Sequence, residues 1–537
     1  MSAIPAPPAA NPPATGWPPG IPYIVGNEGA ERFSFYGMKA ILWVYMVSLF
    51  TNFAAEETIA PAVMKAAEDQ ATGRVHLFIA GVYAFPMLGA LLADRLLGKF
   101  RVILWLSIVY CCGHAVMALA GKTETWMYVG LVLISLGAGG IKPCVSANVG
   151  DQFQAGNAHL VTKVYQIFYF TINFGSFFST LLTPWLYREY GPDVAFGVPG
   201  VLMALATIIF FIGRDKFVKV APSPGGSLGA LDFFSGVLLF MPFAIPAFLH
   251  EFLPIWVQAV ASAVCLVGGV GLFLVRQNRQ DDGGFLSVLV YSVRNQGLRQ
   301  PGEGFFGPAQ RRYGEESAEG PPAVFRIAAV FSMVSVFWAL FDQHSSSWIN
   351  QAKRLDRLVE LPGVGSMQLE ASQIAALNPL MVMLIIPLLN IAVYPLLARV
   401  GVVLSPLRKM STGMFLAAVS FVLVALIQHQ IDAAPPESVS VAWQILPYLV
   451  ITTAEVLVSV TGLEFAYTQA PRRMKSTIMG FWLLCVTVGN LLVAFLSGFE
   501  SLPLASFFWV FAGLMGVAAC IFSFLAWQYR GRTYLQA

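Results

Sequence analysis

Long apolar segments alternate with short polar connections along most of this 537-residue chain. A helix that crosses a membrane needs about 20 consecutive, mostly apolar residues. About fourteen segments have that character, at residues 28–53, 76–97, 101–121, 126–149, 160–186, 193–213, 231–250, 254–275, 323–350, 371–398, 406–429, 441–468, 475–499 and 505–529. The pattern predicts an all-α polytopic membrane protein.

Residues 276–322 break this alternation, because they are rich in Gly, Gln and charged side chains. We interpret them as a cytoplasmic linker in which Phe285 to Val293 forms a short interfacial helix. Leu91–Arg95, after the second span, resembles Leu396–Arg399, after the matching span of the second half. This weak internal similarity indicates two six-helix halves with a site between them, a plan common among secondary transporters.

The expected organisation therefore has five parts. They are a disordered N-terminal tail (1–22), a six-helix bundle (23–214), a two-helix insert (215–275), the linker (276–322) and a second six-helix bundle (323–537). Lys and Arg gather in alternate connections, which predicts that both chain termini are cytoplasmic. The first 20 residues are rich in Pro and Ala and lack Lys and Arg, so they do not have the pattern of a signal peptide.

Composition agrees with a membrane protein and excludes several other classes. Hydrophobic residues make up 57% of the chain and charged residues only 11%, whereas soluble domains carry about 25% charged residues. A net charge of +3 gives no argument for a nucleic-acid partner. The six cysteines lie in or beside apolar segments with no metal-binding spacing. The sequence shows no nucleophile–base or metal constellation of an enzyme, and we expect no cofactor.

The run from Asn27 to Gly37 places charge at the start of the first apolar segment. Glu28, Glu31 and Arg32 fall within five positions, and each charge inside a span costs about 2.5–3.5 kcal/mol on insertion scales. At about 100° per residue, Lys39 lies about 20° from Glu28, so the charges form one stripe that faces a wet cavity or other spans. The alternative is that they pair for structural reasons or lie above the membrane edge.

Several motifs resemble the proton-dependent oligopeptide transporter family of the major facilitator superfamily. They run collinearly over almost the whole chain, at Glu28–Gly37 (the ExxER motif and its continuation), Gly89–Lys99, Gly137–Pro143, Asn148–Phe153, Phe168–Ser176, Phe337–Gln343, Asn378–Pro379 and Glu455–Pro471. The resemblance implies the major facilitator fold. The two extra helices between the halves look like those of bacterial members, which implies a location in the bacterial inner membrane.

The resemblance implies a symporter that imports di- and tripeptides with protons by alternating access, as a monomer in the lipid bilayer. Arg32 and Lys142 would bind the peptide carboxylate, Glu455 its amino group, and Asn173 and Asn378 the amine or the amide. The other implied substrate-binding positions are Tyr36, Tyr83, Tyr169, Trp338, Ser459 and Trp482. From the residues alone, the two asparagines could instead join helices, Lys142 could form a structural pair, and the aromatic residues could be core.

Glu28, Glu31 and His76 are the implied proton-coupling residues. We interpret His76 as opening the second span, where a lone histidine could equally be structural. Lys39 and Asp342 would form an extracellular gate or a static tie. Asp94 and Arg95 would tie cytoplasmic helix ends together. The family often has Tyr at the position of Phe35 and Arg at that of Lys39. The missing hydroxyl would remove one contact, and a lysine pairs less well than an arginine.

Other functions stay open at this point. A relative on the same fold could carry another small solute, such as nitrate, an amino acid or a peptide-like compound. A gated channel and a nutrient receptor without transport are further alternatives. Peptide preference and the number of protons are not determined by the sequence.

Overall fold

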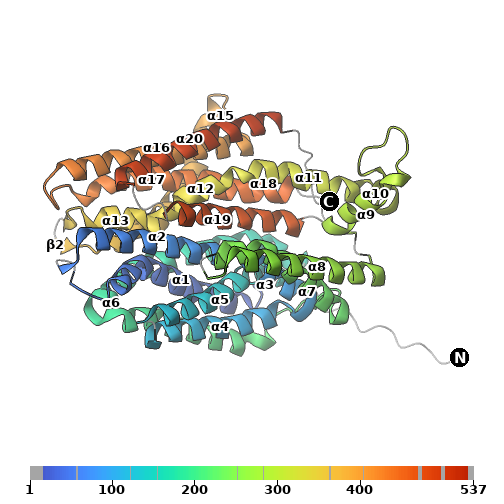
Figure 1. Cartoon of the computed structure of the whole chain (residues 1–537), viewed down its shortest axis with the longest axis horizontal. Coiled ribbons are helices and arrows are strands. Elements are labelled where there is room, and N and C mark those ends of the chain that lie inside the picture. The colour runs from blue at the N-terminus through green and yellow to red at the C-terminus, as the bar shows by residue number, and fades with distance from the viewer. Residues whose placement is uncertain are drawn as a thin grey trace.

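A computed structural model describes residues 16–529 except 56–57, 121, 154, 251, 282, 362–364, 403, 470–474 and 498–501. Two bundles of helices lie side by side with their long axes roughly parallel (Figure 1). Within the described ranges, 13 helices are long and apolar enough to span a membrane, and one of these, residues 163–215, is 53 residues long. The prediction of an all-α polytopic membrane protein is confirmed.

The N-terminal bundle follows the predicted order of spans. Its helices are α1 (Ile21–Phe50), α2 (Pro61–Ala84), α3 (Pro86–Leu92), the π-helix η2 (Ala93–Leu97), α4 (Lys99–Ala120), α5 (Glu124–Asp151) and α6 (Val161–Ile212). Two predicted spans, 160–186 and 193–213, both lie within α6. The chain bends sharply between them at Gly191, whose φ is 81°. That left-handed conformation is open to glycine at little steric cost, so the chain can turn back there.

The first two spans begin earlier than predicted. The second span begins at Pro61 rather than at residue 76, because its first turns carry polar side chains that the apolar pattern does not capture. His76 therefore lies fifteen residues inside α2 and is fully buried, which corrects its placement at a helix end. Helix α1 begins at Ile21, so the predicted tail 1–22 overlaps it, and residues 1–15 of that tail lie outside the described residues.

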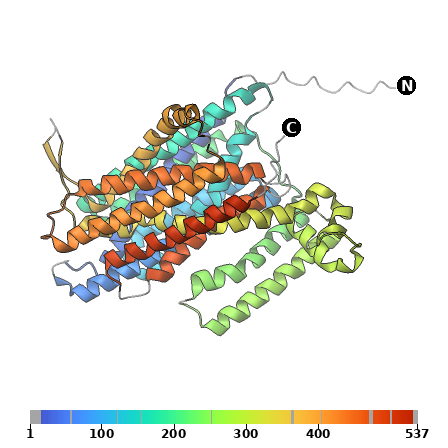
Figure 2. The same cartoon turned by 90° about the horizontal axis from the view of Figure 1, so that it is seen from above.

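The insert is a pair of antiparallel helices beside the N-terminal bundle, α7 (Gly226–Leu249) and α8 (Ile255–Arg279). Figure 2 shows it standing apart from most of the C-terminal bundle. The linker carries α9 (Phe285–Arg294) and α10 (Gly307–Tyr313). Helix α9 matches the short helix expected at Phe285 to Val293. We call the end of the bundles at which α9 and α10 lie the linker end (Figure 1); the Lys and Arg pattern predicts that it is cytoplasmic.

The C-terminal bundle contains several interrupted spans. Its elements are α11 (Glu315–Ser332), α12 (Val334–Phe341), η6 (Asp342–Ser345), α13 (Ser347–Lys353), η7 (Ala371–Ala376), α14 (Leu377–Leu388), η8 (Leu389–Val393), α15 (Tyr394–Arg399), α16 (Pro406–Ala433), η9 (Val441–Gln444), α17 (Ile445–Glu455), η10 (Val456–Val460), α18 (Thr461–Gln469), α19 (Lys475–Ser497) and α20 (Leu504–Gln528). Irregular backbone at membrane depth is tolerated where protein or a wet cavity surrounds it. The interruption η6 is wholly buried and η10 is largely buried, whereas η8 is more exposed, with Ile391 78% exposed.

A short antiparallel hairpin, β1 (Leu358–Leu361) with β2 (Gly365–Gln368), was not predicted. Its position marks the end opposite the linker, which we call the hairpin end (Figure 1). A continuous cluster of buried apolar side chains joins the two bundles, with Trp43 from α1 and Trp348 from α13 among the largest fully buried residues.

Candidate functional site

The charged stripe of α1 faces the interior of the protein. Glu28 and Glu31 are each 1% exposed, and the Arg32 side chain is 13% exposed. Arg32 Nε donates to Glu28 Oε1 at 2.6 Å and lies 3.3 Å from Glu31 Oε2. Both Glu31 oxygens lack a hydrogen-bond partner among the described residues. One guanidinium thus contacts two carboxylates, and of these only Glu28 accepts a hydrogen bond from it.

Lys142 rests on aromatic rings instead of a carboxylate. Its Nζ atom lies 3.8 Å from the centroid of the Phe35 ring and 4.8 Å from that of Tyr83. Within the described part of the chain, this buried ammonium group has no hydrogen-bond partner. Cation–π contact favours such an arrangement. The expected role of Lys142 in binding the peptide carboxylate stays a prediction.

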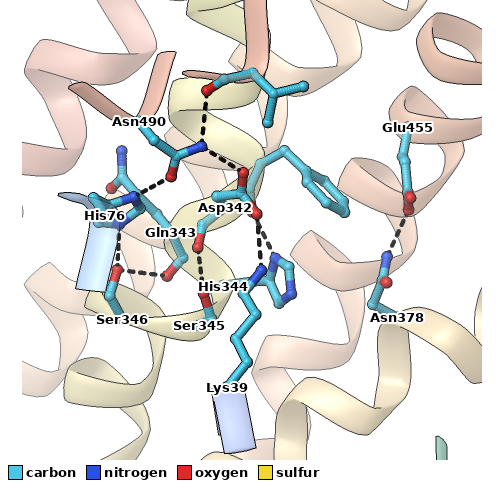
Figure 3. A network of polar contacts seen from close by, with 12 residues as sticks. Lys39, His76, Asp342, Gln343, His344, Ser345, Ser346, Asn378, Glu455 and Asn490 are labelled. Carbon is cyan, nitrogen blue, oxygen red and sulfur yellow. Dashed lines mark hydrogen bonds and ion pairs between the residues drawn. The ribbon is translucent and has the colours of Figure 1, made fainter. Parts of the chain in front are cut away.

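The C-terminal half contributes a carboxylate of its own. Asn378 of α14 donates from Nδ2 to Glu455 Oε2 at 2.8 Å and to Thr452 Oγ1 at 3.1 Å. Figure 3 shows this pair beside a larger polar network, with no bond drawn between the two. Glu455 is the last residue of α17, and the half-buried Ser459 follows within the π-helix η10. The amide–carboxylate bond holds Glu455 without neutralising it, because no cation takes part in it.

Two tyrosine side chains interact with charged groups of both halves. The Tyr36 side chain interacts electrostatically with Arg32 from one half and with Glu455 from the other, and Tyr83 does the same. Tyr169 is 41% exposed, and its carbonyl accepts a 2.9 Å bond from Asn173 Nδ2. The ring centroids of Trp338 and Trp482 lie 6.5 Å apart in an edge-to-face arrangement. The residues expected to bind substrate therefore come from both halves.

A buried ion pair joins the halves on the hairpin side of this region. Lys39 Nζ of α1 lies 2.9 Å from Asp342 Oδ1 of η6, and the two side chains are 6% and 4% exposed. Asp342 Oδ2 accepts a bond of 2.8 Å from Asn490 of α19. Asn490 Oδ1 lies 2.7 Å from His76 Nδ1 (Figure 3). The predicted gate pair and the predicted proton-coupling histidine thus belong to one network.

Sequence reasoning missed several residues of the hairpin end. Asn490 lies in a predicted span, so a lone buried amide in an apolar segment was the available signal. Other unpredicted contacts also join the halves, namely Asn350 Nδ2 to Glu68 Oε2 at 2.9 Å, Arg354 to Glu68 at 3.5 Å, Arg188 to Glu370 at 2.8 Å and Gln373 to the Leu181 carbonyl at 2.8 Å. Spatial neighbours of this kind have no fixed spacing in sequence.

Asp94 and Arg95 occupy the π-helix η2 at the linker end. Arg95 Nη1 lies 3.8 Å from Asp232 Oδ2 of α7 and 3.4 Å from the Ser223 carbonyl, while the Asp94 carbonyl accepts the Ser223 N–H at 2.8 Å. Asp232 also holds the buried Arg276 of α8 at 2.6 Å. These residues were expected to tie cytoplasmic helix ends to one another. The contacts described here join η2 to the insert, and the expected gating role of Asp94 and Arg95 stays a prediction.

Two hollows open at the hairpin end. One, of about 370 Å³, lies against Tyr187, Lys353 and Glu370, and the other, of about 500 Å³, against Glu68, Asn350 and Asp432. Neither includes Arg32, Lys142 or Glu455. Among the described residues, no group of three or more His, Cys, Asp or Glu side chains is arranged to hold a metal ion.

Comparison with known proteins agrees with this arrangement. A family model described as PTR2, POT family, matches residues 100–241 and 306–510. The chain is 32% identical over 447 residues to solute carrier family 15 member 1 of Oryctolagus cuniculus, covering 78% of this chain and 53% of that protein. It is 33% identical over 478 residues to solute carrier family 15 member 2 of Mus musculus, covering 85% and 56%. The chain spans about half the length of these curated relatives.

Solved structures match over nearly the whole chain. A crystal structure of the POT family transporter PepTSo is 37% identical with a TM-score of 0.75, covering 96% of this chain and 98% of the other. A structure of an auto inhibited POT family peptide transporter is 34% identical with a TM-score of 0.75, covering 97% and 99%. The likeness confirms the predicted fold of two six-helix bundles with two additional helices.

Proposed function

Because the chain belongs to the POT family, the proton-dependent oligopeptide transporters, we propose that it imports di- and tripeptides together with protons. It would act by alternating access, as a multi-pass protein of the bacterial inner membrane. The observation that carries this proposal is the opposition of charge across the two halves. Arg32 and Lys142 belong to the N-terminal half, and Glu455 belongs to the C-terminal half.

A short peptide carries one negative and one positive end, and these charges suit the two sides of the site. Arg32 offers a planar, multidentate donor for a carboxylate. Glu455, held by Asn378 but with no cation described on it, offers an acceptor for the amino group. We expect the separation of the two sides to limit peptide length, while the aromatic side chains accept varied peptide side chains.

Proton coupling follows from competition for Arg32. In this structure Glu28 and Glu31 both lie against the guanidinium, so a substrate carboxylate would have to displace them. Protonation of a carboxylate removes its attraction for Arg32 and frees the guanidinium for substrate. Loss of the proton restores the carboxylate–guanidinium contact and favours release. Each binding event therefore shifts the population that the other requires.

The decisive experiment measures uptake of labelled dialanine into proteoliposomes under an inward proton gradient. We expect accumulation above equilibrium that a protonophore abolishes. Glu31→Gln should retain exchange of peptide across the membrane but lose gradient-driven accumulation, because the side chain can no longer change charge. Glu124→Gln, at the exposed start of α5, is the matched control and should behave as the unmodified protein. Accumulation retained in Glu31→Gln would remove its coupling role.

Competition separates peptides from other solutes. Nitrate has no amino group for Glu455 to hold, and a free amino acid has a shorter separation between its charges. We expect dipeptides and tripeptides to inhibit dialanine uptake and nitrate to leave it unchanged. Inhibition by nitrate instead would favour a carrier of another small anion on the same fold.

A further inference from the structure

Asn490 stands at the junction of three spans that no sequence motif connects. It is fully buried in α19. Its Nδ2 atom donates to Asp342 Oδ2 at 2.8 Å and to the Val486 carbonyl at 3.0 Å, and its Oδ1 atom lies 2.7 Å from His76 Nδ1 (Figure 3). A carboxylate only accepts hydrogen bonds, so the amide must present its NH₂ to Asp342 and its oxygen to the histidine.

We propose that Asn490 is a positioning residue that selects the proton-accepting nitrogen of His76 and transmits the charge of that ring to the Lys39–Asp342 gate. This proposal depends on the proposed function in one respect, namely that protons drive the opening of the hairpin end. Asn490 has no described contact with Arg32, Lys142 or Glu455, so its role is separate from substrate recognition.

The selection of a nitrogen follows from the hydrogen bonds. Because Asn490 Oδ1 only accepts, the Nδ1 atom of His76 must carry a hydrogen in both states of the ring. The variable proton is therefore the one on Nε2, which lies 2.8 Å from Ser346 Oγ. In the neutral ring the serine hydroxyl donates to Nε2. When Nε2 gains a proton, the serine accepts from it and can turn its own hydrogen toward the Gln343 carbonyl, 3.5 Å away.

The transmission follows from the sharing of Asp342. One carboxylate oxygen contacts Lys39 and the other accepts from Asn490. A positive charge on His76 polarises the intervening amide and strengthens its bond to Asp342. The carboxylate is then less available to Lys39, and the contact between the halves weakens. Protonation on α2 is thereby communicated to a pair formed by α1 and η6.

Few other charged groups act on this ring. Lys39 and Asp342 both interact electrostatically with His76, and His344 of η6 does so as well. His344 is itself anchored, since its Nδ1 atom lies 2.6 Å from the Phe341 carbonyl. These groups come from α1 and η6, whereas α19 contributes the neutral amide. Removing Asn490 therefore changes the connection between the charges without changing their number.

The test uses the full chain in proteoliposomes and follows the conformation of the hairpin end. Spin labels replace Tyr190 and Trp443, which are 60% and 56% exposed on opposite halves, after the six native cysteines are exchanged for alanine. The distance between the labels is measured from pH 8 to pH 5. We expect the fraction with a long distance, meaning an open hairpin end, to rise on acidification.

Asn490→Leu removes the bonds to His76 and Asp342, together with the one to the Val486 carbonyl, at nearly constant volume. We expect the midpoint of the opening curve to fall by about one pH unit, because the protonated ring loses a hydrogen-bond acceptor. The double variant His76→Gln/Asn490→Leu should show the same opening curve as His76→Gln alone, since the two residues act through one path. Asn490→Ser, which can bond one neighbour but not both, should move the midpoint in the same direction.

Gln428→Leu provides the control for a merely structural role. Gln428 is also a fully buried amide, but its bonds to Gln351 at 3.1 Å and Asp432 at 2.8 Å remain inside the C-terminal half. It should lower thermal stability and leave the midpoint in place. The inference is overturned if Gln428→Leu moves the midpoint as far, if the Asn490 variants leave it unmoved, or if the unmodified protein shows no dependence on pH.

Dialanine uptake distinguishes the two proposals. A protein that opens on acidification, but takes up no peptide, would contradict the proposed substrate and leave the role of Asn490 standing. If Asn490→Leu does not fold, Asn490→Ser decides the matter alone. Normal proton-driven uptake with an unchanged midpoint in that variant would contradict the role of Asn490 and leave the proposed function standing.

Discussion

Ion pairs at the two ends of the bundles have different partners, and the difference shows what each can do. At the hairpin end, Lys39 and Asp342 belong to opposite halves and are almost wholly buried. At the linker end, Asp232 holds Arg276 and Arg95, which belong to the insert and to the N-terminal half. A contact between the halves must break in each cycle of alternating access. A contact inside one half, or between that half and its insert, can persist throughout.

The cost of losing a pair depends on burial as well as on its partners. Removing one member of a buried pair leaves an unsatisfied charge, which costs about 3–5 kcal/mol. An exposed pair contributes about 0–1 kcal/mol and is screened by salt. The comparison of the two ends can therefore be tested with variants that separate burial from position.

The largest effect is expected for Lys39→Ala. The buried Asp342 would lose its cation, so the hairpin end should no longer be held closed, and stability should fall by about 3–5 kcal/mol. Proton-driven uptake should be lost, and spin labels at the hairpin end should report a long distance at neutral pH. Lys65→Ala is the control. Lys65 also lies at the hairpin end, but its 2.7 Å pair with Asp69 stays within helix α2 and does not join the halves. If both variants behave alike, the Lys39–Asp342 pair has no special role.

An intermediate effect is expected for Gly229→Ala at the linker end. A methyl group there would lie 1.8 Å from the Arg95 carbonyl oxygen, so α7 would have to move away from η2. Overpacking of this kind costs about 1–3 kcal/mol, and we expect a lower melting temperature with the insert displaced. Hairpin-end label distances should not change.

Gly271→Ala supplies the control for the insert. Gly271 lies in α8 with nothing within 4 Å of the added methyl group, so the substitution should be neutral or slightly stabilising. A change in the hairpin-end distances of Gly229→Ala would contradict the separation of the two ends.

The smallest effect is expected for Arg188→Ala. Its bond to Glu370 joins the halves at 2.8 Å, but the side chains are 44% and 26% exposed. We expect only a small loss of closure, which disappears in high salt because an exposed pair is screened, measured as a small rise in the open fraction. Lys122→Ala, which breaks an exposed 2.8 Å pair with Asp193 inside the N-terminal half, should not change that fraction at all. A large rise in the open fraction for Arg188→Ala would show that a contact between the halves holds the hairpin end closed even when it is exposed.

The spans were predictable because each is a long apolar run, and even the two in α6 could be separated at Gly191. The stripe of charge on α1 was predictable from helical periodicity, since Glu28 and Lys39 share one face. Polar helix starts were not predictable in this way. The turns after Pro61 carry Lys65, Glu68 and Asp69, and such residues resemble a connection. Only the structure shows that Glu68 contacts the other half, at Asn350 and Arg354.

Contacts between distant segments were the least predictable part. Asp232 and Arg276 are 44 residues apart, and Asn490 and His76 are 414 residues apart. Nothing in the local sequence of either pair specifies its partner. The motifs indicated which residues matter at the centre of the protein, but the packing of whole helices determines which groups meet. Phe35 is an instance, because nothing in its local sequence indicates that its ring lies 3.8 Å from the Nζ atom of Lys142.

The π-helix that follows Glu455 has a consequence for insertions and deletions in this chain. Each π turn holds one residue more than an α turn does, so η10 contains a residue that the regular helical register does not need. Deleting one residue of Val456–Val460 would restore an ordinary helix and leave the bond between Glu455 and Asn378 in place. Every side chain beyond that point would keep its orientation to the bundle, whereas the same deletion in α17 would rotate all of them by about 100°.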